Sequence, residues 1–179
     1  SRVLVHSSIY EEFIHKYLQG LEEFNIGPVI SEQHRSKVLS YIELAKEEGG
    51  KILAGGNVPD KAGAWIEATV IAGLSHTSRT ATEEIFGPVV TVHKFDTDQE
   101  AIEMANCTQY GLAGSVWSKN RGREVAEKIE SGMVWVNTWL HRDLRVPFGG
   151  VKDSGVGREG GMWSIGFFSE AVNICVMED

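Results

Sequence analysis

The chain has 179 residues, of which 42% are hydrophobic and 23% charged, and its formal net charge at pH 7 is -8. These proportions are typical of a globular domain with a sizeable core, and they argue against a disordered, collagen-like or coiled-coil protein. The negative charge, with no cluster of Lys and Arg to offset it, disfavours nucleic-acid binding. The apolar runs are far shorter than the roughly 20 residues of a membrane helix. We therefore expect no nucleic-acid or membrane partner and a cytoplasmic location.

Two cysteines and six histidines are the candidate soft ligands and nucleophiles. Cys107 and Cys175 have no C-x-x-C partner, so reduced thiols are expected, and buried, inert side chains are favoured for both. The histidines are scattered and form no H-E-x-x-H motif. The sequence therefore gives no support for a metal site.

The first half of the chain predicts strands and two amphipathic helices. Valine-rich alternation predicts a strand over 2–6, followed by a helix that Ser7 or Ser8 caps. Ser31 is expected to cap a second helix, which ends at Gly49 and Gly50. Further short strands are predicted over 51–54 and 65–71. The apolar stripes of the two helices are Tyr10, Phe13, Ile14, Tyr17 and Leu18, and Val38, Tyr41, Ile42 and Ala45.

The second half alternates strands with helices. A strand over 89–95 leads to the capping box Thr97-x-x-Glu100 and a helix. A strand over 112–117, a helix capped by Asn120 and a strand over 133–137 follow, and then a short helix over 163–168. Residues 171–177 alternate in polarity, which suggests an edge strand that could pair with another subunit. This order predicts an α/β fold with an open, mostly parallel sheet and flanking helices.

A glycine-rich stretch, PFGGVKDSGVGREGG at 147–161, contains the spacing G-x-G-x-x-G at Gly155, Gly157 and Gly160. A dinucleotide-binding loop needs a parallel strand directly before it and a full crossover helix and strand after it. Here about ten residues separate the preceding strand from Phe148, and only 18 residues follow Gly161. We therefore expect these glycines to allow positive φ and close backbone approach rather than to bind a phosphate.

Three segments in order carry a family resemblance: EEIFGP at 83–88, YGLAGSVWS at 110–118, and NTWLHRDLRVPFGGVKDSGVGRE at 137–159. Together they closely resemble the C-terminal half of the NAD(P)-dependent aldehyde dehydrogenase superfamily. Within it, SGMVWVNTWLHRDLRVPFGG is most similar to the 2-aminomuconic and 2-hydroxymuconic semialdehyde dehydrogenases. The resemblance covers nearly the whole chain.

The resemblance implies that the nucleophilic cysteine, the general-base glutamate and the Rossmann domain precede the segment that begins at Ser1. It implies a catalytic-domain portion over 1–165 and a C-terminal helix turn and oligomerisation strand over 166–179. No residue of this chain is then expected to be a catalytic nucleophile or base. The chain is expected to be inactive alone and to belong to a homo-oligomer.

The resemblance also assigns cofactor-binding residues, with NAD as the expected cofactor. Glu84 matches the carboxylate that accepts hydrogen bonds from the nicotinamide ribose hydroxyls, a role suited to an acceptor-only group. Phe86 matches the aromatic residue beside the nicotinamide. Glu83 is expected to be structural. The alternatives for Glu84 and Phe86 are a solvated carboxylate and a core ring.

Substrate-binding residues are expected in the third segment. Arg142 matches a pocket position, and its planar guanidinium suits a semialdehyde with a carboxylate at its far end. The alternatives are a surface arginine paired with Asp143, or Arg145 in the same role. Phe148 and Leu140 match positions that line the substrate tunnel, although plain loop packing is the alternative for Leu140.

A function from another class stays open beside the enzyme. The chain could be a non-catalytic, truncated paralogue that acts as an oligomerisation or interaction domain. A free-standing Rossmann nucleotide binder is a further alternative, which would need the glycine motif to hold a phosphate.

Overall fold

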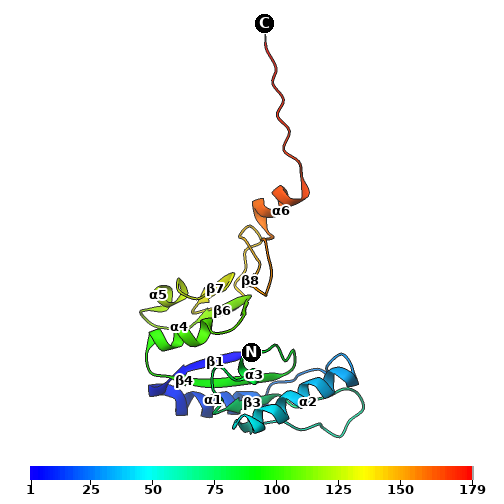
Figure 1. Cartoon of the computed structure of the whole chain (residues 1–179), viewed down its shortest axis with the longest axis vertical. Helices are drawn as coiled ribbons and strands as arrows, with labels where there is room; N and C mark the ends of the chain where they lie inside the picture. The colour runs from blue at the N-terminus through cyan, green and yellow to red at the C-terminus, as the bar shows by residue number, and fades with distance from the viewer. Residues whose placement is uncertain (179) are drawn as a thin grey trace. The chain divides into compact units, whose positions relative to one another are not determined.

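The computed structural model describes residues 1–178, apart from the side chain of Glu22, and divides into two compact units over 1–108 and 109–179 (Figure 1). Each unit has its own sheet structure. The elements of the first unit are β1 (Arg2–His6), a 3-10 turn η1 (Ser7–Ile9), α1 (Tyr10–Glu22), α2 (Glu32–Glu47), β2 (Lys51–Ala54), β3 (Thr69–Ala72), α3 (Arg79–Thr82), β4 (Val89–Phe95) and α4 (Asp98–Asn106).

The first unit is built on one four-stranded sheet in the order β1-β4-β3-β2. β1 and β3 both pair with β4 in parallel, with Arg2 opposite Thr91 and Thr69 opposite Val89. β2 runs antiparallel to β3 at the edge. The prediction of an α/β fold with a mostly parallel sheet is therefore confirmed.

Both faces of this sheet are covered by helices. Consecutive residues of a strand point to opposite faces, and Val70 packs in the cluster under α1 while Ile71 packs in the cluster under α2. The α1 cluster also includes Val5 and Val92. Arg2, on the opposite face of β1, donates to the carbonyls of residues 104 and 105 at the end of α4. The sheet is thus a central layer with α1 on one side and α2 and α4 on the other.

Serine and threonine side chains cap α2 and α4 but not α1. The Ser31 hydroxyl accepts the His34 amide, and the Thr97 hydroxyl accepts the Glu100 amide, as expected. The prediction that Ser7 or Ser8 caps α1 is wrong: these serines belong to η1, where the Ser8 amide donates to the His6 side chain, and α1 starts after Ile9 without a side-chain cap. A 3-10 turn satisfies the free amides that the serine was expected to bond.

Strand β3 is shorter than predicted at its start. It begins at Thr69 rather than at residue 65, because the Glu67 amide turns away to donate to the Asn57 carbonyl. The Trp65 indole likewise donates to the Ala62 carbonyl within the preceding loop. Residues 65–68 therefore belong to the loop and not to the ladder.

The described part of the second unit, residues 109–178, contains two small sheets and two helices. Its elements are β5 (Tyr110–Gly111), β6 (Ala113–Val116), α5 (Gly122–Ala126), β7 (Met133–Val136), β8 (Val151–Lys152) and α6 (Gly161–Phe168). β6 and β7 pair in parallel, whereas β5 and β8 pair antiparallel. The prediction that Asn120 caps α5 is wrong, since Arg121 precedes the helix and makes no side-chain cap bond.

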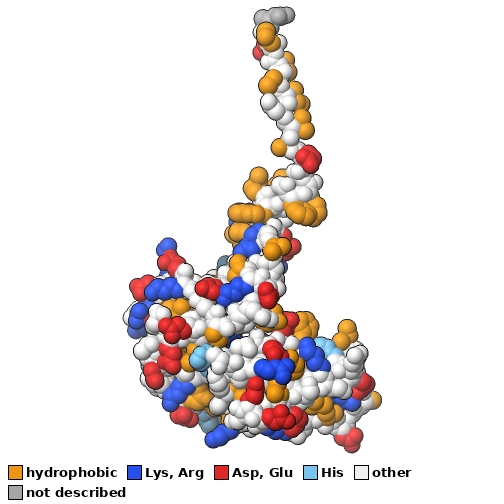
Figure 2. Space-filling view, viewed as in Figure 1, with side chains coloured by type: hydrophobic (Ala, Val, Ile, Leu, Met, Phe, Trp, Pro, Cys, Tyr) orange, Lys and Arg blue, Asp and Glu red, His pale blue; other side chains and the backbone are white. Residues whose placement is uncertain are grey.

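The last segment follows α6 as an extended chain. Residues 170–178 form no helix or strand within the described chain, so the edge strand over 171–177 stays a prediction. Figure 2 shows hydrophobic side chains gathered on α6 and the segment after it. The exposed ones are Met162, Trp163, Ile165, Phe167, Phe168, Val172, Ile174, Val176 and Met177. A search of residues 1–178 finds no helix able to span a membrane.

Candidate functional site

The turn EEIFGP lies directly before β4, at the amino end of that strand. Ile85 is buried in the cluster under α2, and Gly87 lies so close to α2 that an added Cβ would come within 2.6 Å of a Val38 methyl. Real Cβ atoms do not approach that closely. The buried isoleucine and the glycine therefore fix the backbone of the turn against α2.

Two side chains of α2 bind the backbone of the same turn. The Lys37 Nζ donates to the Glu84 carbonyl at 3.1 Å, and the His34 Nε2 lies 2.7 Å from the Phe86 carbonyl, where the imidazole N–H is the donor. Phe86 has φ of +60°, a left-handed conformation that costs a non-glycine residue about 1–2 kcal/mol. The two hydrogen bonds and the packing of Ile85 hold this strained backbone in place.

As a result the turn presents Glu84 and Phe86 outward. Phe86 is 72% exposed and Glu84 is also exposed, with the Ser1 amino group as the charge that acts on the Glu84 carboxylate. Glu83, in contrast, accepts hydrogen bonds from Tyr41 and Arg79, and the Arg79 and Tyr41 contacts lower the pKa of Glu83. An exposed carboxylate close in the chain to an exposed ring fits a ligand that brings two hydroxyls and a flat ring. Glu83 is the structural member, as its sequence position suggested.

The loop that carries the other predicted residues leaves β7 in the second unit. Asn137 binds both the amide and the carbonyl of Ser118 through its side chain, at 2.8 and 2.9 Å. The Trp135 indole donates to the His141 carbonyl at 2.9 Å, and the Ser115 hydroxyl donates to the Thr138 carbonyl. Ser115 of β6, Trp135 of β7 and Asn137 just after β7 thus hold the start of the loop.

Arg142 makes two contacts in this loop region. Its guanidinium carbon lies 4.1 Å from the centre of the Phe148 ring, and its Nη2 lies 3.4 Å from the Glu159 Oε1. The alternative pairing with Asp143 does not occur. Asp143 instead accepts a two-point ion pair from Arg145, at 2.9 Å and 2.5 Å, and the Arg145 hydrogen bonds lower the pKa of Asp143. The charge of Arg145 is therefore already partnered, whereas that of Arg142 faces a single, longer contact.

The structure brings the predicted residues together in two groups. Glu84 and Phe86 share the turn of the first unit, and Arg142 and Phe148 are in contact in the second. Leu140 lies on the same loop as Arg142, is 62% exposed and has φ of +55°. The sequence reasoning missed His34 and Lys37 behind the turn and Glu159 beside Arg142. Spacing could not have revealed them, because each is brought to its partner by tertiary packing.

The glycine motif does not form a phosphate loop in the described part of the chain. The strand before it is the two-residue, antiparallel β8, and not a parallel strand. Gly155, Gly157 and Gly160 all have positive φ. An added Cβ on Gly160 would overlap the Val146 carbonyl. These glycines therefore close a tight loop, as expected.

The two cysteines differ from expectation in burial. Both are exposed and neither forms a disulfide, so the prediction of buried thiols is wrong. Cys107 follows the end of α4, where its sulfur donates to the carbonyl of Met104 at 3.0 Å, which keeps it at the surface of the first unit. Cys175 lies in the extended terminal segment. No cluster of His, Cys, Asp and Glu able to hold a metal occurs among residues 1–178.

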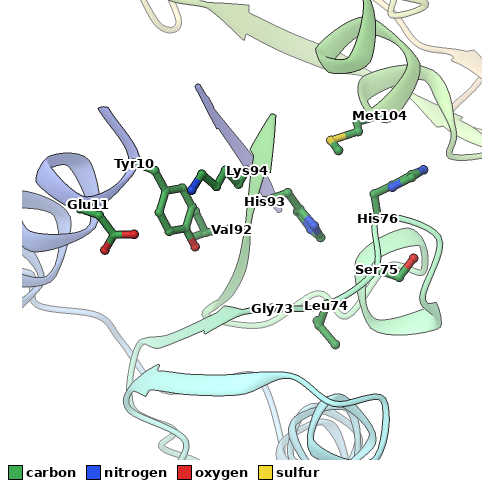
Figure 3. Close-up of a pocket in the computed structure, with 10 residues that line it drawn as sticks. All are labelled: Tyr10, Glu11, Gly73, Leu74, Ser75, His76, Val92, His93, Lys94 and Met104. Atoms are coloured by element: carbon green, nitrogen blue, oxygen red, sulfur yellow. The ribbon is translucent and has the colours of Figure 1, made fainter. Parts of the chain in front are cut away.

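A separate cavity of about 460 Å³ opens at the carboxyl ends of β3 and β4 (Figure 3). Its lining includes Tyr10, Glu11, His76, His93 and Lys94 and none of the five predicted site residues. His93 is only 4% exposed, and its Nε2 lies 3.0 Å from the Thr91 hydroxyl. Burial, and then the nearby Arg2, lower the pKa of His93 to about 4. His93 is therefore a neutral, structural imidazole at pH 7.

The chain matches one protein family and is similar to several known proteins. Residues 1–174 match the model of the aldehyde dehydrogenase family. The chain is 48% identical to a 2-aminomuconic 6-semialdehyde dehydrogenase of Pseudomonas sp, covering 99% of this chain and 40% of that protein. It is 43% identical to the human 2-aminomuconic semialdehyde dehydrogenase, over 98% of this chain and 40% of that one. The chain thus spans about 40% of the length of these relatives.

Solved structures agree in fold. Betaine aldehyde dehydrogenase from Staphylococcus aureus, solved in complex with NAD+, superposes with a TM-score of 0.88 and 41% identity. The match covers 94% of this chain and 37% of that structure.

Proposed function

The chain belongs to the aldehyde dehydrogenase family, and on that premise we propose that it contributes cofactor-binding and substrate-binding residues to an NAD-dependent enzyme. The proposed reaction is the oxidation of a semialdehyde that carries a carboxylate, such as 2-aminomuconic semialdehyde, to the acid. The observation that carries the choice of substrate is the Arg142 guanidinium, stacked on Phe148 and held by only one long ion-pair contact.

The cofactor proposed is NAD, which supplies a hydride acceptor when bound. The proposed ligands in this chain are Glu84 and Phe86. The Glu84 carboxylate would accept hydrogen bonds from a ribose diol, and the exposed Phe86 ring would lie against a flat heterocycle. Support comes from the exposed carboxylate, from the two hydrogen bonds that hold the turn, and from the NAD+ bound in the Staphylococcus aureus relative.

The substrate proposed is recognised at its far end by Arg142. A guanidinium can bind a carboxylate through two parallel N–H bonds and keeps its charge at any working pH. Arg145 is the weaker candidate, because its Nε and Nη2 already donate to Asp143. Phe148 and Leu140 are proposed to line the path of the aldehyde chain.

No residue of this chain is proposed as a nucleophile or base. We propose residues 1–165 as the catalytic-domain portion and residues 166–179 as the part that joins subunits of a homo-oligomer. The exposed apolar side chains of α6 and of residues 172–177 support that role for the terminal part. A cytoplasmic location stays a prediction.

The experiment that tests this function compares two six-carbon aldehydes, adipate semialdehyde and hexanal, which differ at the end far from the aldehyde. With NAD and the complete protein that carries this sequence, kcat/KM should be about 10-fold or more higher for adipate semialdehyde, since a charged hydrogen bond contributes about 1.5–3 kcal/mol. NADH formation is the measurement. Absence of NADH formation with any aldehyde would favour the non-catalytic alternative, and equal values would remove the carboxylate preference.

The role of Glu84 makes a separate prediction. Glu84→Gln keeps the shape but removes the charge and one acceptor oxygen, so the cofactor should be less well oriented for hydride transfer. We expect kcat to fall about 10-fold, the value of one charge-assisted hydrogen bond, and the primary deuterium isotope effect of the aldehyde hydrogen to increase. The neighbouring Glu83→Gln is the matched control, expected to lower thermal stability without raising the isotope effect. An unchanged isotope effect and rate in Glu84→Gln would contradict the role.

A further inference from the structure

The environment of Arg142 has two parts that differ in chemistry. The Arg142 guanidinium carbon lies over the Phe148 ring, 4.1 Å from the ring centre, and the Arg142 Nη2 lies 3.4 Å from the Glu159 carboxylate. The Arg142 side chain is 45% exposed and that of Glu159 is 66% exposed. A guanidinium has five N–H donors in a fixed plane. Glu159 engages Nη2 alone, so most of the donor edge of Arg142 stays available.

The two residues that contact Arg142 are themselves joined by the backbone. The Phe148 amide donates to the Glu159 carbonyl at 2.8 Å, and the Glu159 amide donates to the Phe148 carbonyl at 2.8 Å. This is the hydrogen-bonded pair of an antiparallel ladder, in which directly opposed side chains project on the same side. The ring and the carboxylate are therefore fixed relative to each other.

We propose that Phe148 and Glu159 form a single holder that positions Arg142 for the carboxylate of the substrate. The inference rests on the proposed function and extends it by naming Glu159 as a positioning residue for specificity. The ring fixes the plane of the guanidinium, and the carboxylate fixes its rotation within that plane. Without both contacts, the half-exposed Arg142 side chain would sample several rotamers. Binding of the substrate would then restrict it to one rotamer, which costs conformational entropy.

Glu159 acts on Arg142 in two opposing ways, and these can be separated. As a hydrogen-bond acceptor it orients the guanidinium, which favours binding of a carboxylate. As a negative charge near the same site it repels a carboxylate. Gln at position 159 keeps an acceptor oxygen without the charge, whereas Ala removes both. Both variants are uncharged at position 159, so a difference between Glu159→Gln and Glu159→Ala reports only the effect of the hydrogen bond on the orientation of Arg142.

The test measures kcat/KM for adipate semialdehyde and for hexanal in the complete protein that carries this sequence. Any effect of residue 159 on chemistry common to both aldehydes cancels in the ratio of the two values. We expect this ratio to be about 5-fold higher in Glu159→Gln than in Glu159→Ala, which corresponds to one modest hydrogen bond. Activity toward hexanal also reports whether each variant has folded.

A second arm repeats both substitutions in an Arg142→Ala background. If Glu159 acts through Arg142, the difference between Gln and Ala should disappear there, as in a double-mutant cycle. Equal ratios in the two position-159 variants would overturn the proposal, and so would a difference that persists without Arg142. The exposed ion pair of Glu127 with Arg123 provides a matched control. Glu127→Gln and Glu127→Ala should give the same ratio of kcat/KM for adipate semialdehyde to kcat/KM for hexanal.

The outcomes also separate this proposal from the proposed function. If Arg142→Ala lowers activity toward the charged aldehyde alone but position 159 has no effect, only the holder is wrong. If Arg142→Ala affects both aldehydes equally, the substrate assignment fails, and the holder fails with it.

Discussion

Replacing Arg142 by alanine is expected to lower kcat/KM for adipate semialdehyde by about 100-fold and to change that for hexanal by less than about 3-fold. A hydrogen bond to a charged group contributes about 1.5–3 kcal/mol, and a guanidinium can make two such bonds to one carboxylate. Hexanal has no carboxylate and should not sense the loss. Steady-state NADH formation with both aldehydes gives the two values.

Two control variants sharpen this expectation. Arg142→Lys keeps the charge but loses the planar fork and the stack on Phe148, so it should recover only part of the lost activity. Arg145→Ala should leave the preference for the charged aldehyde nearly unchanged, because Arg145 is bound to Asp143. A large selective loss in Arg145→Ala, with little effect of Arg142→Ala, would exchange the roles of the two arginines.

The buried His93 is expected to make the stability of the first unit depend on pH. Its pKa is about 4 in the folded protein, compared with an ordinary value of about 6.5 in the unfolded chain. Between pH 6.5 and pH 4 the unfolded state binds more protons than the folded state. The contribution of His93 to the free energy of unfolding is therefore fully present above pH 6.5 and is lost as the pH falls toward 4. The free energy of unfolding should decrease by about 2 kcal/mol between pH 8 and pH 5 from this residue alone.

Denaturant unfolding at pH 8 and pH 5 measures this decrease. Other groups near His93 titrate or carry charge, including Arg2 and His76, together with Glu11 and Lys94 in the same cavity wall. These groups are present in both the parent and His93→Gln, so their contribution to the pH dependence of the unfolding free energy cancels in the difference between the two proteins. The Gln variant should lose about 2 kcal/mol less than the parent over this pH range. The same pH dependence in both proteins would contradict a buried, neutral His93.

Much of the fold could be predicted from local sequence signals. Strand β1, helix α2 with its Ser31 cap and the Thr97 cap of α4 are correct, because periodicity and caps depend on residues close in the chain. The second bond of the expected capping box differs, since the Glu100 carboxylate accepts the Asp96 amide. The errors arose where a competing local bond took over. Ser8 belongs to a 3-10 turn, and the Glu67 amide donates to the Asn57 carbonyl within the β2–β3 loop, so that β3 starts later than expected.

The candidate site could be predicted in its residues but not in its contacts. The motif around Glu84 identified the turn, yet the support from His34 on α2 comes from 52 positions away and leaves no local pattern. Sequence proximity suggested Asp143 as the partner of Arg142. The structure instead pairs Asp143 with Arg145, and Arg142 with Glu159 from across a backbone bridge. Adjacent charges in a loop are therefore a poor guide to ion pairing.

Gly132 and Gly149 lie against each other at the two ends of the segment over 133–148, which carries Arg142. An added Cβ on Gly132 would overlap the Gly149 carbonyl, so the backbone where β7 begins touches the backbone where the loop containing Arg142 ends. Any side chain at position 132 would therefore push the end of this loop away from the start of β7, and the loop can close in its observed form only with glycine there.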